Sequence, residues 1–392
     1  MPQSQNLVED VTWTSLGLGI LRGATTIMSD RHSIVIALNE RMWERVGSRD
    51  SLEKLSAAFD YRVEMFDLAS GWTAPPSPDA EAESRLVLAG KGADALVVSH
   101  GAPRITGEIL DQLPNIGFVG ELEGDRFAYR IDVDACYKRG VRVVDTNNFC
   151  SPPVAEWALA LILMGLRNYG QVFRRIVLER QPAHPANWEE DWGSVNGELR
   201  GKTVGLIGLG HIARELLKLL APFDATVYVY DPYVPRELAE ICGVTLTSLD
   251  TVMSVSDVVV NLVPLTPATD GMVGRREIDL LRRGAVFVNV GRGRTVDTAA
   301  LTDRVRTGEV IACLDVTEPE PLPPASELID LPTTILSPHI AGLVSAGHPR
   351  SLALMVDELT RHFAGHEPWF SILPRTVANR QGARLDASGV GT

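Results

Sequence analysis

The stretch Val204-Gly205-Leu206-Ile207-Gly208-Leu209-Gly210-His211-Ile212-Ala213 decides the fold. Its apolar first half predicts a strand, and the residues after it predict a helix over 214–220. Two glycines spaced Gly-x-Gly at such a junction let the chain turn tightly and let the backbone approach a phosphate group. The amino terminus of the helix then offers unpaired N–H groups to the anion. The stretch therefore predicts a dinucleotide-binding site that includes Gly208, Gly210, His211 and Ile212.

An acidic residue follows at the distance that a ribose-binding carboxylate requires. Asp231 ends the next apolar run, about 20 residues beyond the glycine loop. A carboxylate there accepts a hydrogen bond from the ribose 2′-hydroxyl and repels a 2′-phosphate, so the sequence favours NAD over NADP. Arg236 is the competing feature, because an arginine at this edge could hold a 2′-phosphate instead.

The apolar runs fall into two series of strands that alternate with helix-like segments. Such alternation predicts an α/β protein with parallel sheets. In the first series we expect strands at 33–38, 62–67, 95–100, 116–120 and 141–145, with helices at 51–59 and 106–113. The second series has six runs, which fits a doubly wound nucleotide fold; they lie at 203–207, 226–230, 257–262, 285–290, 310–314 and 334–336.

The bulk composition excludes several classes of protein. The chain has 392 residues, 45% hydrophobic residues and a formal net charge of −13. An acidic chain lacks the basic face that nucleic-acid binding needs, and no apolar run reaches the roughly 20 residues of a membrane span. Four cysteines without metal-like spacing predict no metal site and a reducing cytoplasm.

Three candidate reacting groups follow the last strands of the second series. Arg292 is flanked by glycines, and a guanidinium grips a carboxylate with two N–H donors. Glu318 and Glu320 lie in a proline-bounded acidic segment, and His339 follows the final strand. A carboxylate beside an imidazole orients the ring and favours its protonated form, which can donate a proton to a ketone as a hydride arrives. These residue types predict hydride transfer to or from a nicotinamide.

These stretches together resemble the D-isomer-specific 2-hydroxyacid dehydrogenases, the family of phosphoglycerate, glyoxylate/hydroxypyruvate and D-lactate dehydrogenases. The resemblance covers most of the second series: 201–215, 257–266, 288–297, 314–321 and 337–342. It implies that Arg292 orients the substrate, that Glu320 rather than Glu318 supports the histidine, and that His339 is the acid/base. It also implies that the cofactor contacts Pro264, Val290, Asp315 and His339, and that the substrate carboxylate binds His100, Gly101 and Ala102.

The resemblance also implies a domain organisation and a homodimer. We expect a Rossmann-type nucleotide domain over 153–344, inserted into a flavodoxin-like substrate domain formed by 28–152 and 345–375. Helices are expected at 153–166 and 345–363. The segment 181–200, rich in tryptophan and acid, is either an arm packed on a second subunit or a loop folded on its own domain. Residues 1–27 and 376–392 lack apolar periodicity and are expected to be disordered. For residues 1–27 the alternative is that the chain starts at Met28.

The chain departs from the family pattern in its first half. The segment 120–132 is longer and more charged than the usual glycine-rich turn, and 148–151 replaces the usual glycine-containing hinge. The main hypothesis is an NAD-dependent oxidoreductase that interconverts a small 2-oxo acid and a D-2-hydroxy acid. The alternatives are an NAD-sensing interaction protein, similar to the corepressors of this fold, and a relative that oxidises phosphite. Formate dehydrogenases rank lower because they usually carry glutamine at the Glu320 position.

Overall fold

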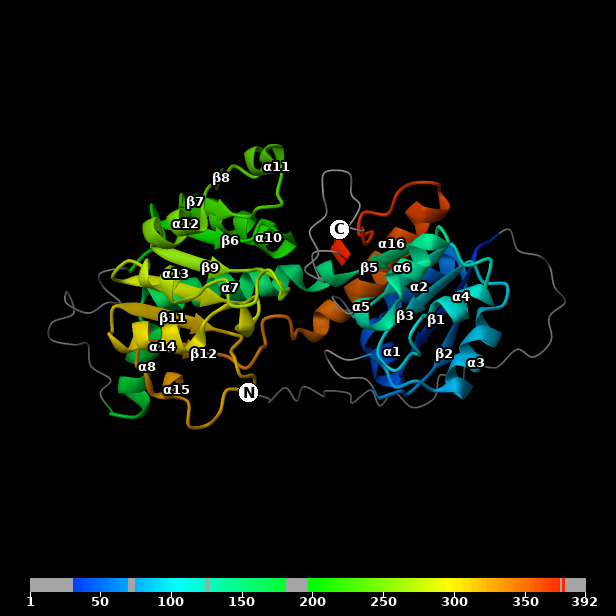
Figure 1. The fold of residues 1–392 in the computed structure, drawn as a ribbon, viewed down its shortest axis with the longest axis horizontal. Helices are drawn as coiled ribbons and strands as arrows, with labels where there is room; N and C mark the ends of the chain where they lie inside the picture. Colours follow the sequence, from blue (N-terminus) through cyan, green and yellow to red (C-terminus); the bar gives the residue numbers. More distant parts are fainter. Residues whose placement is uncertain (1–30, 70–74, 124–126, 181–196, 374–375, 378–392) are drawn as a thin grey trace, which may run out of the picture.

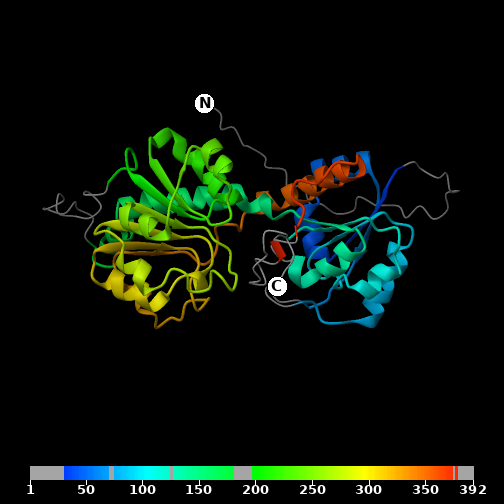
Figure 2. The same cartoon turned by 45° about the horizontal axis from the view of Figure 1, so that its top comes forward.

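The protein is built on two parallel sheets in separate lobes. A computed structural model describes residues 31–69, 75–123, 127–180, 197–373 and 376–377. One sheet has five strands in the order β2-β1-β3-β4-β5, and the other has seven in the order β12-β11-β10-β9-β6-β7-β8. Figures 1 and 2 show each sheet with its helices as a distinct body. The expected α/β class is confirmed. The expected tails at 1–27 and 376–392 lie outside the described residues, except that 376–377 are described and helical.

The five-stranded sheet comes from the first series of apolar runs. Its strands are β1 (Ser33–Leu38), β2 (Asp60–Met65), β3 (Ala95–Val98), β4 (Phe118–Glu121) and β5 (Arg142–Asp145). The helices between them are α1 (Glu40–Val46), α2 (Arg49–Ala58), α3 (Ala80–Gly90), α4 (Gly107–Asp111), α5 (Phe127–Arg130) and α6 (Val133–Lys138). All five expected strands are present. The third ends two residues early, because the chain turns at His100 and Gly101.

The seven-stranded sheet holds the glycine loop. Its strands are β6 (Thr203–Ile207), β7 (Thr226–Tyr230), β8 (Thr245–Leu246), β9 (Val258–Asn261), β10 (Ala285–Asn289), β11 (Val310–Leu314) and β12 (Thr334–Leu336). Its helices are α10 (His211–Leu220), α11 (Arg236–Ile241), α12 (Leu249–Val255), α13 (Arg275–Asp279), α14 (Thr298–Arg306) and α15 (Glu327–Asp330). β9, β10 and β11 are buried along their whole length, which explains their continuous apolar runs. The sequence missed β8, because two residues carry no periodic signal.

Among the described residues, three α-helices lie outside the two alternating series: α7 (Ser151–Leu166), α8 (Tyr169–Val177) and α16 (His348–Phe363). α7 packs on α10 and β10 of the seven-stranded sheet, whereas α16 packs on α2 and α1 of the other lobe. A 3₁₀ turn over Ser345–Gly347 precedes α16, so the expected helix begins three residues later than predicted. We propose that the substrate domain comprises 28–152 with 345–375 and the nucleotide domain 153–344.

One described helix is long and apolar enough to cross a membrane. It covers Asn148–Leu166, and 56% of it is buried inside the structure. The core helix of a soluble protein passes the same test of length and composition, so this helix is weak support for a membrane span.

Each sheet has a point where the order of its strands reverses. In the first sheet β1 lies between β2 and β3, and in the second β6 lies between β7 and β9. In open parallel sheets, ligands bind outside the carboxyl ends of the strands at this point. The loops after β1 and β3, and those after β6 and β9, are therefore the places for a binding site.

Candidate active site

The glycine loop after β6 has the geometry of an anion site. Gly208 has a φ of 98°, and its N–H donates to the carbonyl of Tyr230 at 2.8 Å. A side chain at Gly210 would meet nothing within 4 Å in the described structure. α10 begins at His211 without a side-chain cap, so the first N–H groups of the helix, at His211 and Ile212, face outward for a phosphate.

Asp231 is anchored beside this loop. Its Oδ2 accepts from the N–H of Leu209 and its Oδ1 from the N–H of Tyr233, both at 2.9 Å. Each carboxylate oxygen has a second lone pair for a ribose hydroxyl. Arg236 instead pairs with Glu240 on exposed α11, at 2.8 Å. The arrangement favours a ribose with a free 2′-hydroxyl.

The loop after β9 borders the glycine loop, and the loop after β10 borders the end of β9. A Cβ at Gly208 would lie 3.2 Å from Val263, the residue before Pro264, and the N–H of Val290 donates to Asn261. His211 packs edge-on against Phe370, and desolvation, followed by the nearby Arg214, lowers the pKa of His211 to about 4. His211 is therefore neutral near pH 7, and its backbone rather than its side chain carries the attraction for an anion.

Buried amides hold Arg292 at the carboxyl end of β10. Its carbonyl accepts from Nδ2 of Asn289 at 3.2 Å and from Oγ1 of Thr295 at 2.7 Å. Asn261 Nδ2 in turn donates to both Asn289 and Thr295. The Arg292 guanidinium is half-buried and donates to the Gly291 carbonyl at 2.7 Å. The side chains of Asn289 and Thr295 thus fix the main chain of Arg292, and the Gly291 carbonyl holds its guanidinium.

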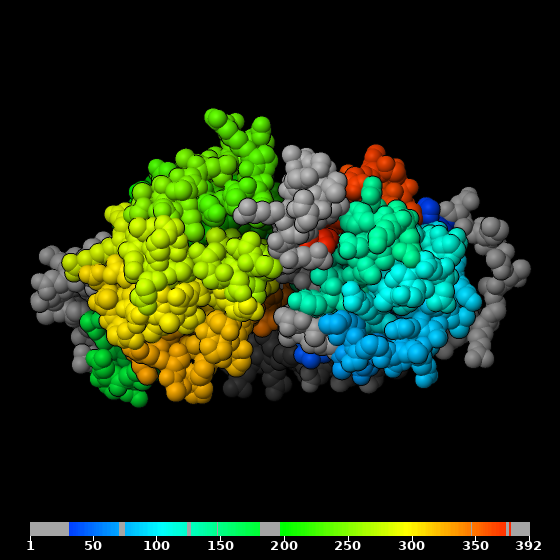
Figure 3. All heavy atoms as spheres, viewed as in Figure 1, coloured from blue at the N-terminus to red at the C-terminus, as the bar shows by residue number. Residues whose placement is uncertain are grey.

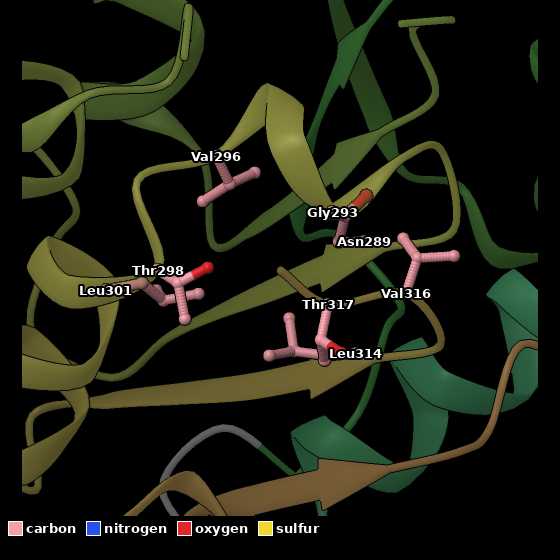
Figure 4. A pocket seen from close by; sticks show the side chains of 8 residues that line it. All are labelled: Asn289, Gly293, Val296, Thr298, Leu301, Leu314, Val316 and Thr317. Atoms are coloured by element: carbon pink, nitrogen blue, oxygen red, sulfur yellow. The ribbon is translucent and has the colours of Figure 1, made fainter. Parts of the chain in front are cut away.

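The Arg292 loop packs directly on the loop that follows β11. A Cβ at Gly293 would overlap the carbonyl group of Thr317, so only glycine fits there. Beneath this contact lies a cavity of about 10 Å³. Figure 4 shows its lining: Asn289, Gly293, Val296, Thr298, Leu301, Leu314, Val316 and Thr317. It has room for one water at most and is too small for a substrate, so it marks close packing of the two loops.

His339 and Glu320 form a carboxylate–imidazole pair. Nδ1 of His339 lies 2.6 Å from Oε1 of Glu320, and both side chains remain about 40% exposed. The structure thus brings Glu320, not Glu318, to the histidine. With Nδ1 engaged by a carboxylate, Nε2 is the nitrogen that can exchange a proton with a substrate.

Asp315 organises the histidine loop. Its Oδ1 accepts from Ser337 Oγ at 2.5 Å and from the N–H of Ile340 at 3.0 Å, and its Oδ2 accepts from Ala341 at 3.0 Å. His339 has a φ of 52°, a left-handed conformation that costs a non-glycine residue about 1–2 kcal/mol. Surrounding hydrogen bonds must therefore hold it, and the 2% exposed Asp315 supplies them.

The predicted substrate loop follows β3 in the other lobe. The carbonyl of His100 accepts from Asn39 at 2.7 Å, so the loop lies against the end of β1, at the strand-order reversal. The N–H of Gly101 donates to no other group in the described chain, whereas Ala102 donates to Ser99. Gly101 has a φ of 93°, and a Cβ there would lie 2.6 Å from the Phe66 carbonyl oxygen. A side chain at position 101 would therefore clash with the backbone of Phe66, so only glycine fits there.

Sequence reasoning missed several residues of these loops. Asn261 and Asn289 are buried polar residues at strand ends, a signal that could have identified them, and the buried Thr295 lies in the turn that follows β10. Trp157 on α7 donates to Ser337 at 3.1 Å and so extends the Asp315 network, which no local pattern predicted.

Comparisons with known proteins agree with this geometry. The model of "D-isomer specific 2-hydroxyacid dehydrogenase, NAD binding domain" matches residues 159–341. A glyoxylate reductase from Thermofilum pendens is 32% identical over 270 residues, which cover 68% of this chain and 77% of that one. The chain belongs to the D-isomer-specific 2-hydroxyacid dehydrogenase family. The family predicted from the sequence is confirmed. The matched NAD-binding domain also confirms NAD as the cofactor.

Other family members match less of their own length or only in fold. A D-3-phosphoglycerate dehydrogenase from Archaeoglobus fulgidus is 34% identical over 246 residues, 62% of this chain and 45% of that one. This chain thus spans about half of the phosphoglycerate dehydrogenases that it matches. A phosphoglycerate oxidoreductase from Rhizobium etli has 21% sequence identity and a TM-score of 0.74, with 88% of this chain and 100% of that one covered. This likeness shows the fold alone.

Proposed function

We propose that this protein is an NAD-dependent dehydrogenase that interconverts a small 2-oxo acid and the corresponding D-2-hydroxy acid. The observation that carries the proposal is the 2.6 Å contact between His339 and Glu320 at the carboxyl edge of the sheet that also bears the glycine loop and Arg292. An acid/base pair, a guanidinium and a dinucleotide loop on one sheet edge are the groups that this reaction requires.

Each group has a separate task in the proposed mechanism. Arg292 binds the substrate carboxylate and polarises the neighbouring carbonyl. Nε2 of His339 donates a proton to the carbonyl oxygen during reduction and removes it during oxidation, while Glu320 holds the ring and stabilises its charged form. NADH supplies the hydride when bound. Family membership and the geometry support these roles.

The second half of the proposed site is the His100–Ala102 loop. The N–H of Gly101, which has no other acceptor among the described residues, would donate to the substrate carboxylate. The loop lies on the lobe opposite the nucleotide site, and the two lobes lie side by side in Figure 3. Domain closure would therefore bring the two halves together, exclude water and align the hydride donor with the carbonyl carbon.

The test is NADH oxidation across a panel of 2-oxo acids: glyoxylate, hydroxypyruvate, pyruvate, phenylpyruvate, 2-oxoglutarate and a branched acid. We expect turnover of at least one acid with NADH and far slower turnover with NADPH. Tight NADH binding without turnover of any acid would contradict the proposal and favour a sensing role.

We also propose a cytoplasmic homodimer. The four cysteines, Cys136, Cys150, Cys242 and Cys313, are all free, which suits a reducing compartment. The expected arm at 181–200 lies almost entirely outside the described residues, and α7 is largely buried within its own chain. α8 instead exposes an apolar stripe at helical spacing, formed by Tyr169, Phe173, Ile176 and Val177. Sedimentation and cell fractionation test the two parts of this proposal.

A further inference from the structure

Three buried polar side chains meet at the carboxyl ends of β9 and β10. Asn261 ends β9 and Asn289 ends β10, and the two residues are partners in the parallel register of these strands. Thr295 lies in the short 3₁₀ turn after β10. Asn261 and Thr295 are fully buried, and Asn289 is 2% exposed. Polar groups buried this deeply need hydrogen-bond partners inside the protein.

Main-chain groups fix the orientation of the Asn289 amide. The N–H of Gly291 donates to Oδ1 of Asn289 at 3.1 Å, and the carbonyl of Arg292 accepts from Nδ2 of the same amide at 3.2 Å. A backbone N–H only donates and a carbonyl only accepts, so an exchange of the amide oxygen and nitrogen would lose both hydrogen bonds. Asn289 therefore has one orientation, in which its oxygen can accept a further hydrogen bond.

The orientation of the Asn261 amide follows from its two neighbours. Its Nδ2 lies 3.1 Å from Oδ1 of Asn289 and 2.7 Å from Oγ1 of Thr295. The Asn289 oxygen can only accept. The Thr295 hydroxyl donates its single proton to the Arg292 carbonyl at 2.7 Å, so it must accept from Asn261. The two N–H bonds of the Asn261 amide thus orient both side chains that hold the Arg292 carbonyl.

The stability of the fold does not by itself account for an amide at position 261. If this amide is removed, Oδ1 of Asn289 keeps the Gly291 N–H, and the Thr295 hydroxyl keeps the Arg292 carbonyl. Oδ1 of Asn261 is itself buried without a hydrogen-bond partner in the described chain. An apolar residue of similar shape should therefore cost the fold little. It would remove the constraint on the directions of the two neighbouring side chains.

We propose that Asn261 is a positioning residue for Arg292, and that its amide acts on the guanidinium through Asn289 and Thr295. The proposal rests on the proposed function, in which Arg292 binds the substrate carboxylate. A guanidinium that must meet a carboxylate with two N–H donors tolerates little error in the position of its main chain. The main chain of Asn261 adds to the same link, because its carbonyl accepts from the N–H of Val290 at 3.3 Å.

The first test compares Asn261→Leu with the wild-type protein. Leucine is close to asparagine in size and shape but donates no hydrogen bond. We expect kcat/KM for the 2-oxo acid to fall about tenfold, because a substrate-binding group is slightly misplaced. The melting temperature and the NADH affinity should stay near the wild-type values. An unchanged kcat/KM would overturn the proposal, and so would a large fall in melting temperature in both Asn261→Leu and the second variant described next.

A second variant tests the next link. Thr295→Val replaces the hydroxyl with a methyl group in a side chain of the same shape, and it should reproduce the loss in kcat/KM. Thr295→Ser keeps the hydroxyl and should stay near wild type. The control is Ser256→Ala, which removes a fully buried hydroxyl two residues before β9, at the other end of that strand. A loss in Ser256→Ala as large as that in Asn261→Leu would overturn the assignment.

A double-mutant cycle shows whether Asn261 acts through Arg292. Arg292→Ala leaves no guanidinium to position, so Asn261→Leu should cause less than about a twofold further loss in that background, measured by single turnover. A further loss equal to that in the wild-type background would show that Asn261 acts elsewhere and would overturn the proposal.

A spectroscopic readout separates this proposal from the proposed function. In ¹H–¹⁵N spectra of the full-length protein, the Nε–H signal of Arg292 is identified by its loss in Arg292→Ala. It should shift in Asn261→Leu and Thr295→Val but not in Ser256→Ala. A signal that stays in place overturns the positioning role even in an active enzyme. A shifted signal together with no turnover of any acid supports the positioning role and overturns the proposed reaction.

Discussion

Nδ1 of His339 lies 2.6 Å from Oε1 of Glu320, although 19 positions separate the two residues and they follow different strands. The contact forms because β11 and β12 are neighbours in the sheet, so the loops after them share one edge. In the proposed mechanism the contact leaves Nε2 of His339 to exchange a proton with the substrate, so the loss of either residue should lower the rate.

We expect Glu320→Gln and His339→Ala to lower kcat by about 10²–10⁴-fold, the usual contribution of positioned acid–base catalysis. The affinity for NADH should persist, because neither residue lies in the glycine loop. Single-turnover kinetics and fluorescence titration measure the two effects. Glu318→Gln, at an exposed neighbour, is the control and should stay near wild type. Equal losses in Glu318→Gln and Glu320→Gln would contradict the assignment.

Asp315→Asn should damage the histidine loop rather than the cofactor site. An amide nitrogen would face a backbone N–H in place of an acceptor, and such a buried mismatch costs about 1–3 kcal/mol. We expect a lower melting temperature and a kcat reduced about tenfold or more. A large rise in KM for NADH with unchanged kcat would instead indicate a direct contact between Asp315 and the nicotinamide.

Two glycine substitutions should separate loop packing from cofactor binding. Gly293→Ala places a methyl group on the Thr317 carbonyl, so it should destabilise the fold and reduce kcat/KM for the acid. Gly210→Ala places its methyl group in open space, so the melting temperature of the apoprotein should hold while NADH affinity falls. Calorimetry and NADH titration of both variants check this. An intact NADH affinity in Gly210→Ala would argue against a phosphate at this loop.

The exposed apolar stripe on α8 is the proposed interface of the dimer, so a charge placed in it should dissociate the dimer. Phe173 is 48% exposed and stacks on Tyr169, with their ring centroids 5.7 Å apart. A charge at the centre of an apolar interface is strongly unfavourable, so Phe173→Asp should shift sedimentation towards the monomer. Leu88→Asp, at an exposed leucine of the other lobe, is the control and should leave the assembly intact. A dimer that survives Phe173→Asp would place the interface elsewhere.

Replacing Glu358 with glutamine should stabilise the protein in a pH-dependent way. The side chain is fully buried, its Oε1 has no partner in the described chain, and burial raises the pKa of the carboxyl. The folded state therefore holds the proton more tightly than the unfolded state, so this group loses stability as pH rises from the unfolded pKa through the folded one. Glu358→Gln removes the charge and should stabilise by about 1 kcal/mol at pH 7–8. The gain should vanish near pH 4, and a gain equal at both pH values would refute the explanation.

Local patterns along the chain determine much of the architecture. Apolar runs predicted eleven of the twelve strands in the described part of the chain. The signal is strongest for β9, β10 and β11, because a parallel strand that is buried on both faces must be apolar on both. The glycine loop, Asp231 and the Arg292, Glu320 and His339 segments were predicted because each depends on neighbours within a few residues. β8 and the exact ends of the helices escaped, because they depend on contacts with other segments.

The sequence alone thus determined the fold class, the family and the edges of the sheets where the site lies. Only the tertiary structure placed the Glu320 carboxylate against His339, assigned Asp315 to the histidine loop and joined Arg130 to His100. Each of these choices is a contact between side chains on different loops. Such contacts depend on which strands become neighbours and on how deeply the groups are buried, and neither is encoded in the spacing of residues along the chain.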